Sequence, residues 1–234
     1  MSRKIICISG FEGSGKDTVA SVLEKHYQFK RLSFADNLKK ALCVIFGWKF
    51  EDIQGLTKES RIWREQVDPF WAEELGQPDF TPRKALQLVG TNLFRNQLHP
   101  DIWIKSLKKE IIQTPGNIVI VDGRFPNEID AIQKMGGYCI RVTRNDPDWI
   151  HYYHQLKEEV KVMHSTLCHE LEVNDDPSEE NLSKYIIDML YTKHQIHPCE
   201  TSLLHYHAYH HTIDNTKTLD DLIANVHQMM ATIE

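Results

Sequence analysis

The chain has 234 residues, of which 41% are hydrophobic and 26% are charged, and its formal net charge is -6. These values fit one globular domain and argue against non-specific binding of nucleic acid, while they allow a local basic pocket for a small anion. No apolar run approaches the roughly 20 residues of a membrane span. The five cysteines form no C-x-x-C pair, so we expect a cytoplasmic protein in a reducing compartment.

Predicted strands and helices alternate along the chain. Residues 4–10 form a short apolar run typical of a strand buried on both faces, and residues 16–27 have helical spacing. Further strand-like segments lie at 29–34, 117–125, 138–144 and 210–215, and helical segments at 35–47, 81–98, 100–113, 126–137, 178–194 and 218–233. Residues 48–81 predict loops and short helices. This order indicates a parallel β-sheet covered by helices on both faces.

The segment GFEGSGKDT, residues 10–18, joins the first strand to the first helix. Its glycine and lysine spacing in this context predicts a loop that binds nucleotide phosphates through backbone N–H groups, the helix N-terminus and Lys16. A tight turn with a solvated lysine is the structural alternative. The expected contacts are Gly10, Gly13, Ser14, Gly15, Lys16, Asp17 and Thr18.

Asp17 stands where the usual phosphate-loop pattern has a Ser or Thr that binds Mg²⁺. An acidic residue in the first helical turn also complements the helix dipole, so simple capping is the alternative for Asp17. We assign the hydroxyl that binds Mg²⁺ to Thr18 instead. The order Gly-Lys-Asp-Thr at residues 15–18 is similar to that in the loops of small-molecule and nucleotide kinases. No N-K-x-D motif occurs, which disfavours a GTPase.

A second candidate site follows the predicted strand at 117–125. Asp122 lies at the end of this strand, where phosphate-loop enzymes often carry a metal-organising carboxylate, and Arg124 offers a bidentate phosphate contact. Glu128 lies in the first turn of the next helix. An ordinary turn with an Arg–Glu surface pair is the alternative.

The region between the second and third predicted strands is rich in arginine. Arginine suits phosphate recognition, and an aromatic face can stack on a base, although each residue alone is more typical of a surface or core position. The residues concerned are Arg61, Arg64, Arg83, Arg95 and Trp63.

Together these segments resemble the deoxynucleoside monophosphate kinases of phages and large DNA viruses. The resemblance rests on GFEGSGKDT, SFADNLKKAL (33–42), TPRKALQLVGTNLFRNQLHPDIWI (81–104), VDGRFPNE (121–128), HPCETSL (197–203) and IDNTKTLDDL (213–222). It covers most of residues 1–145 and 197–232. Cys199 departs from it, since the family tends to have Ser there.

The resemblance implies a site for ATP and a site for an acceptor nucleotide. ATP would bind the glycine loop and Arg144, with Mg²⁺ near Thr18 and Asp122. Lys16, Asp122 and Arg124 would be catalytic. The acceptor would be surrounded by Lys39, Arg64, Arg83, Gly90, Trp103, Asp122, Arg124 and Glu128.

The expected fold is a three-layer α/β P-loop fold of the nucleoside and nucleotide kinase type, in a single domain over 1–234. Within it we expect an insertion for the monophosphate at about 48–115 and a lid or insertion at about 145–196, which holds lysines where such lids carry arginines. The histidine-rich stretch 194–211 is expected to hold no specific metal, although His207 and His211 have i,i+4 spacing.

The expected reaction transfers the γ-phosphoryl group of ATP to the phosphate of a deoxynucleoside monophosphate, through positioning and charge neutralisation. One alternative is a kinase for phosphomevalonate or dephospho-coenzyme A, which would need no base pocket. Another is a nucleotide-binding module without turnover.

The expected partners are small nucleotides, with no nucleic acid and no membrane, and a homodimer is left open. The resemblance also implies a preference for deoxyribose, with Trp103 as the candidate apolar wall against a 2′-hydroxyl.

Overall fold

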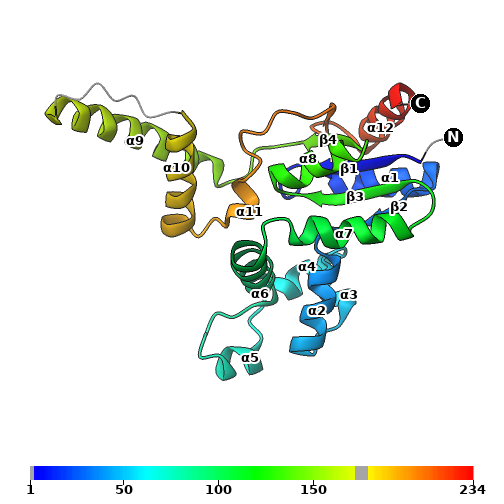
Figure 1. The fold of residues 1–234 in the computed structure, drawn as a ribbon, viewed down its shortest axis with the longest axis horizontal. Helices are drawn as coiled ribbons and strands as arrows, with labels where there is room; N and C mark the ends of the chain where they lie inside the picture. Colours follow the sequence, from blue (N-terminus) through cyan, green and yellow to red (C-terminus); the bar gives the residue numbers. More distant parts are fainter. Residues whose placement is uncertain (1–2, 172–178, 234) are drawn as a thin grey trace. The chain divides into compact units, whose positions relative to one another are not determined.

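The computed structural model describes residues 3–171 and 179–233. The chain forms two compact units, one of Met1–Arg144 with His207–Glu234 and one of Asn145–Tyr206. The first unit contains the sheet and the second is helical (Figure 1).

The sheet has five parallel strands in the order β2-β3-β1-β4-β5. Their bounds are β1 (Ile5–Ser9), β2 (Lys30–Leu32), β3 (Ile118–Gly123), β4 (Tyr138–Thr143) and β5 (His211–Asp214). The sheet confirms the predicted parallel α/β fold. Because parallel strands end at the same edge, the loops that follow them meet there, and ligands of open α/β sheets bind at this edge.

Helices cover both faces of the sheet. On one face α1 (Lys16–Tyr27) and α12 (Leu219–Ile233) pack with the alternate strand residues Ile6 and Ile8 in one buried core. The opposite face carries Cys7 and Cys139, and the Cys139 thiol donates to the carbonyl of Ile129 in α8 (Pro126–Lys134) at 3.6 Å. The molecule therefore has the three layers that the sequence predicts.

A helical insertion lies between β2 and β3. It comprises α2 (Asp36–Phe46), α3 (Phe50–Gln54), α4 (Lys58–Glu65), α5 (Pro69–Glu74), α6 (Pro82–Gln87), η1 (Leu88–Leu98) and α7 (Ile102–Gln113) (Figure 1). It has its own core, in which Trp48 stacks on Phe46 at 4.5 Å and meets Trp63 edge-on at 5.7 Å. Trp63 is thus a core aromatic residue, the alternative to base stacking that the sequence left open.

The predicted helix at 81–98 changes its winding part-way. It begins as predicted, because the Thr81 side chain accepts a hydrogen bond from the Lys84 amide at 3.1 Å. From Leu88 it continues as the π-helix η1, and at its end the His99 amide donates to the Phe94 carbonyl, five residues back, at 3.0 Å. Hydrophobic spacing does not predict this wider turn, which is rare and often found at functional sites.

The second unit contains α9 (Ile150–Leu171), α10 (Glu179–His194) and α11 (Pro198–Thr201). α9 and α10 pack through a small core of Tyr153, Leu156, Val160, Ile186 and Leu190. The predicted lid at about 145–196 falls within this unit and stays a prediction. Its residues 172–178, including the first residue of the helix predicted at 178–194, lie outside the described residues.

Histidines of the 194–211 stretch have structural contacts. His205 Nε2 lies 2.9 Å from the Tyr153 hydroxyl, and His194 stacks on Tyr152 at 4.0 Å. In the first unit, His210 Nδ1 accepts a hydrogen bond from the Cys139 amide at 2.9 Å. Across the described residues, no three or more His, Cys, Asp or Glu side chains are grouped to hold a metal ion. Nor does any helix within 3–171 and 179–233 combine the length and apolarity needed to cross a bilayer.

Candidate active site

The loop after β1 keeps its backbone close to neighbouring groups. Gly10, Gly13 and Gly15 have positive φ values of 142°, 76° and 98°. A Cβ on Gly10 would lie 2.2 Å from the Val142 carbonyl oxygen, and one on Gly15 would lie 2.3 Å from Asn215 Nδ2. Both positions therefore exclude side chains as well as requiring a conformation that glycine adopts readily. The result is an exposed backbone cradle at the start of α1.

Polar groups of this loop fit an anionic ligand. The Lys16 ammonium donates to the carbonyls of Gly10 at 2.7 Å and of Phe11 at 2.6 Å. Ser14 Oγ is buried and has no hydrogen-bond partner among the described residues, a costly state for a hydroxyl. Phosphate oxygens would accept hydrogen bonds from both side chains, and the N-terminus of α1 adds a favourable potential. The loop therefore fits the phosphates of a nucleotide.

Asn215 supports this loop from the other end of the sequence. It follows β5, and its side-chain amide donates to the Ser14 carbonyl at 2.8 Å. Its backbone N–H donates to the Thr143 carbonyl at the end of β4, also at 2.8 Å. Sequence reasoning did not select Asn215 as a site residue, although a polar residue directly after a predicted strand was the available signal.

A cleft of about 490 Å³ opens beside the loop. Cations outnumber acids in its walls, which suits a site for phosphate-bearing ligands. The cationic residues are Lys16, Arg31, Lys39, Arg61, Arg64, Arg124 and Arg144, and the acidic ones are Glu12, Asp17, Asp36 and Asp122. The phosphate loop and the insertion both contribute to these walls.

The cleft brings together some of the predicted site residues and leaves others outside. Those in its walls are Gly13, Gly15, Lys16, Asp17, Thr18, Lys39, Arg64, Asp122, Arg124 and Arg144. Those outside its walls are Gly10, Ser14, Arg83, Gly90, Trp103 and Glu128. The roles assigned to both groups stay predictions.

Asp17 pairs with two arginines that the sequence did not connect to it. Its carboxylate lies 3.1 Å from Arg31 NH1, on β2, and 3.4 Å from Arg61 NH2, on α4. Arg31 also pairs with Glu24 at 2.8 Å. Asp17, which stands where the usual motif has Ser or Thr, thus pairs with Arg31 and Arg61 at one wall of the cleft.

Asp122 accepts three hydrogen bonds from the turn before α2. The Ser33 hydroxyl donates at 2.6 Å, and the amides of Phe34 and Ala35 donate at 2.8 Å and 3.0 Å. An ionised carboxylate has about four lone-pair positions, so about one stays available. A magnesium contact at Asp122 is therefore better served through a bound water than by direct ligation.

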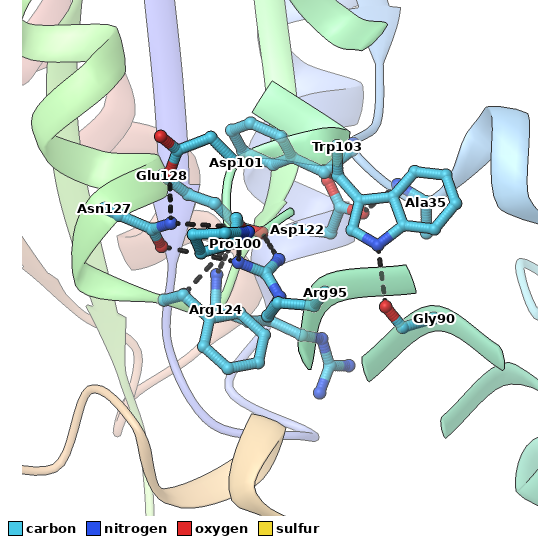
Figure 2. Close-up of polar contacts among 12 residues, drawn as sticks. Ala35, Gly90, Arg95, Pro100, Asp101, Trp103, Asp122, Arg124, Asn127 and Glu128 are labelled. Carbon is cyan, nitrogen blue, oxygen red and sulfur yellow. Dashed lines mark hydrogen bonds and ion pairs between the residues drawn. The ribbon is translucent and has the colours of Figure 1, made fainter. Parts of the chain in front are cut away.

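Glu128 and Arg95 form a buried pair behind Arg124 (Figure 2). Arg95 NH2 donates to Glu128 Oε1 at 2.5 Å, and the Arg95 guanidinium lies 3.8 Å from the centre of the Phe125 ring. Glu128 Oε2 accepts the backbone amides of Arg124 at 2.9 Å and Phe125 at 3.1 Å. Glu128 thus fixes the backbone that carries Arg124 rather than entering the cleft.

Burial raises the pKa of Glu128 to about 7, although the positive charge of Arg95 and the Arg124 amide act in the opposite direction. Removal of the carboxyl from water is therefore the stronger effect.

Gly90 and Trp103 contact each other in the insertion (Figure 2). The indole N–H of Trp103 donates to the Gly90 carbonyl at 2.8 Å. A Cβ on Gly90 would lie 2.6 Å from Leu38 Cδ2, so this glycine permits close packing of η1 against α2. Trp103 packs against the insertion core. The proposed apolar wall is therefore not a wall of the cleft in this structure.

Arg83 bridges two glutamates. Its guanidinium lies 2.7 Å from Glu12 Oε2 in the phosphate loop and 3.2 Å from Glu65 Oε1 at the end of α4. Lys39, in contrast, lies in the cleft wall, where its ammonium donates to Gln54 Oε1 at 3.0 Å. Burial lowers the pKa of Lys39.

Sequence comparisons place the chain among known proteins. The sequence model of the family described as deoxynucleotide monophosphate kinase matches residues 71–185. A protein of Acanthamoeba polyphaga mimivirus that bears this name is 36% identical over 155 residues, which cover 60% of this chain and 74% of that protein. The chain belongs to the deoxynucleotide monophosphate kinase family.

A second member of the family, the deoxynucleoside-5′-monophosphate kinase of Escherichia phage T5, is 46% identical over 179 residues, covering 56% of this chain and 72% of that protein. The resemblance seen in the sequence motifs is thereby confirmed. The phosphate loop lies outside residues 71–185, so its geometry adds to the family match independently. Among solved structures, a dephospho-CoA kinase from Campylobacter jejuni covers 99% of this chain and 98% of its own, with a TM-score of 0.41 and 15% identity, too low a likeness to support a function.

Proposed function

We propose that this member of the family transfers the γ-phosphoryl group of ATP to the phosphate of a deoxynucleoside monophosphate, giving a deoxynucleoside diphosphate and ADP. The observation that carries the proposal is a single cleft that contains the glycine loop with Lys16 and a second group of cations, Lys39, Arg64 and Arg124. Phosphoryl transfer between two phosphates needs two anion sites side by side, with reacting atoms held in line.

The chain's own residues would act by positioning and by charge. Lys16 would exchange its carbonyl partners for phosphate oxygens of ATP, and the loop amides would hold the rest of the triphosphate. Arg124 would approach the acceptor phosphate from a backbone that Glu128 fixes. No covalent intermediate on the protein is needed, since the charge that develops on the transferring group is met by groups already in place.

The oxygen groups near Lys16 fit a magnesium ion. Thr18 and Asp122 both lie in the cleft wall, and Mg²⁺ prefers oxygen ligands and keeps several waters. We propose Thr18 as a ligand and Asp122 as a partner through water. Bound Mg²⁺ supplies neutralisation of phosphate charge. We also propose that the protein acts in the cytoplasm on free nucleotides, which agrees with a net charge of -6 that disfavours nucleic acid.

The test is an ADP-release assay on dGMP, dTMP, dCMP and dAMP, each beside its ribonucleotide counterpart, with uridine monophosphate for dTMP. We expect turnover with at least one deoxynucleotide and a kcat/KM about 10- to 100-fold above that of the ribonucleotide, because a site that excludes an added hydroxyl by shape alone discriminates by about 100-fold at most. Equal or better turnover of ribonucleotides would contradict the deoxynucleotide assignment. Silence with every nucleotide would contradict the proposal as a whole.

Lys16→Ala is the control in the same assay. It should lower kcat by about 100-fold or more, since a lost donor to the developing charge has this effect in other enzymes. ADP release that persists in this variant would come from a contaminating kinase or from a site other than the loop.

A further inference from the structure

The turn between β3 and α8 is attached to the insertion on two sides. On one side Asp122 accepts hydrogen bonds from the Ser33 hydroxyl and from two amides of the turn before α2. On the other side the Asn127 side-chain amide donates to Asp101 Oδ1, in the turn before α7, at 2.8 Å. Arg124 lies between these two attachments in the sequence and lines the cleft. The backbone that carries Arg124 is therefore held by both ends of the insertion.

Arg95 is the charged member of the second attachment (Figure 2). It lies on η1, is only 8% exposed, and is not among the residues that line the cleft. Its NH2 group donates to Glu128 Oε1 at 2.5 Å, and its NH1 group donates to the Pro100 carbonyl at 3.1 Å. Its guanidinium also lies 3.8 Å from the centre of the Phe125 ring. One fork thus joins η1, the turn before α7 and the start of α8.

Glu128 connects Arg95 to the backbone of Arg124. Its Oε1 accepts from Arg95, while its Oε2 accepts the amides of Arg124 at 2.9 Å and Phe125 at 3.1 Å. Because both oxygens accept from donors, the arrangement suits the ionised carboxylate. A proton on either oxygen would compete with the guanidinium or with the two amides.

The ionised form of Glu128 depends on Arg95. Burial raises the pKa of Glu128 to about 7, and the charge of Asp122 on β3 raises it as well, whereas Arg95 lowers it. The Cys7 thiol on β1 also lies near Glu128, but its hydrogen bond with Cys139 and its burial raise the pKa of the thiol, so it stays neutral. Loss of Arg95 would therefore favour a protonated Glu128 at neutral pH.

We propose that Arg95 is a positioning residue, which holds Glu128 in place and thereby fixes the backbone from which Arg124 reaches the acceptor. Arg95 itself would touch no ligand, in contrast to the phosphate recognition suggested by its place in the arginine-rich region. The insertion would thus contribute to the cleft through its walls and, in addition, through the orientation of a residue outside it. The inference rests on the proposed function, because it concerns the acceptor of that reaction.

The first test compares steady-state kinetics of Arg95 variants on the deoxynucleotide that the wild type prefers. Arg95→Met should lower kcat/KM for the acceptor about 10- to 100-fold and change KM for ATP by less than about 3-fold, because a small displacement of a positioned group is enough for such a loss. Arg95→Lys keeps the charge and loses the fork, so its loss should be smaller.

Lys40→Met is the matched control for the kinetics. Like Arg95, Lys40 is a cation of the insertion that pairs with a glutamate on another helix, Glu110 at 3.5 Å, but neither partner belongs to the turn at 122–128. This variant should leave kcat/KM for both substrates unchanged.

The second test asks whether Arg95 acts through Glu128. Glu128→Gln removes the charge next to Arg95 and keeps an oxygen for the amides of Arg124 and Phe125. The double variant should lose no more acceptor kcat/KM than the more affected single variant, because both changes break the same connection. It also leaves no unpaired buried charge, so it provides the measurement if Arg95→Met alone does not fold. Additive losses would show that Arg95 acts independently of Glu128 and would overturn the inference.

The third test does not depend on turnover. Amide hydrogen exchange of the free protein, followed by NMR, reports directly on the N–H groups of Arg124 and Phe125. Exchange at these two amides should be about 10-fold faster or more in Arg95→Met than in the wild type, as expected for a weakened hydrogen bond to a charged group. The amide of Ile120, inside β3, should keep its protection, and Lys40→Met should change none of the three.

The outcomes separate the inference from the proposed function. Wild-type kinetics for the acceptor in both Arg95 variants would overturn the inference alone. Equal losses for ATP and for the acceptor, or unchanged exchange at Arg124 and Phe125, would overturn it too. A wild type without turnover would refute the proposed function, and the exchange measurement would still decide whether Arg95 holds the turn.

Discussion

Glu128 is a buried carboxyl on which two effects act in opposite directions. Burial favours its protonated form, while Arg95 at 2.5 Å and the Arg124 amide favour the ionised form. Burial is the stronger effect and raises the pKa to about 7. The folded protein therefore binds a proton at Glu128 more tightly than the unfolded chain, whose glutamates titrate near the ordinary value of about 4.3.

This difference predicts a pH-dependent stability. Between about pH 4.3 and pH 7 the contribution of Glu128 to the free energy of unfolding should fall as pH rises, by at most about 1.4 kcal/mol per pH unit. Urea melts of the wild type and Glu128→Gln at pH 5 and pH 8 would measure it. The free energy of unfolding of the wild type, relative to that of the variant, should be lower at pH 8 than at pH 5. Parallel pH curves for the two proteins would contradict the raised pKa.

Among the elements, the phosphate loop depends on strands that are far apart in sequence. β1 leads into the loop, but the Asn215 amide after β5 holds the Ser14 carbonyl at 2.8 Å. This bond gives the Ser14 carbonyl a partner and helps to hold the backbone of the loop in place. The loop following β5 is thus a support for the ATP side of the site.

Asn215→Ala should therefore raise KM for ATP by about 5- to 10-fold, as expected for the loss of one hydrogen bond of about 1 kcal/mol or slightly more. KM for the acceptor should change little. Asn225→Ala is the matched control, because the Asn225 amide also bonds the end of β5, donating to the Asp214 carbonyl at 3.1 Å, but is exposed. Steady-state kinetics of the three proteins make the comparison. Equal effects of both variants would show a general loosening of β5.

Local patterns predicted the elements well where apolar spacing is regular. The strands at 4–10 and 117–125 and the helix at 126–137 correspond to β1, β3 and α8. The π-helix η1 was not predictable from apolar spacing, and Gly90 within it packs against Leu38, a contact between separate helices. The sequence carries no local signal for such a contact.

At the scale of the molecule, charge is distributed unevenly. The formal net charge is -6, yet cations outnumber acids in the walls of the cleft. An anionic ligand is therefore repelled by the protein as a whole and attracted at the cleft. Dissolved salt weakens this attraction, because it shortens the distance over which exposed charges act on a ligand.

Raising the salt concentration from about 0.1 M to about 1 M should thus lower kcat/KM for the acceptor several-fold, since the Debye length falls from about 10 Å to about 3 Å. The slope of log kcat/KM against log salt should become shallower in Arg64→Ala. It should stay unchanged in Lys108→Ala, whose exposed side chain lies on α7 outside the cleft. A slope that is flat in the wild type, or equal in both variants, would contradict a cationic cleft.

The site was only partly predictable from the sequence. The glycine loop and Lys16 are contiguous, so their spacing indicated both the structure and the ligand class. The partners of Asp17 and Asp122 were not predictable, because Arg31, Arg61 and the turn at Ser33 approach them only in the folded chain. For Trp103 the sequence predicted a contact that the structure does not show. This motif residue was expected at the ligand, but it packs in the insertion core.

The bond between Asn215 and Ser14 joins residues that are 201 positions apart, and this separation has a consequence for the newly made chain. Ribosomes add about 5–20 residues per second, so Ser14 is made about 10 to 40 seconds before Asn215. Throughout that interval the growing polypeptide carries the glycine motif without the amide that supports it. ATP is therefore expected to bind the growing polypeptide more weakly than the folded protein until Asn215 has been made and its bond to Ser14 has formed.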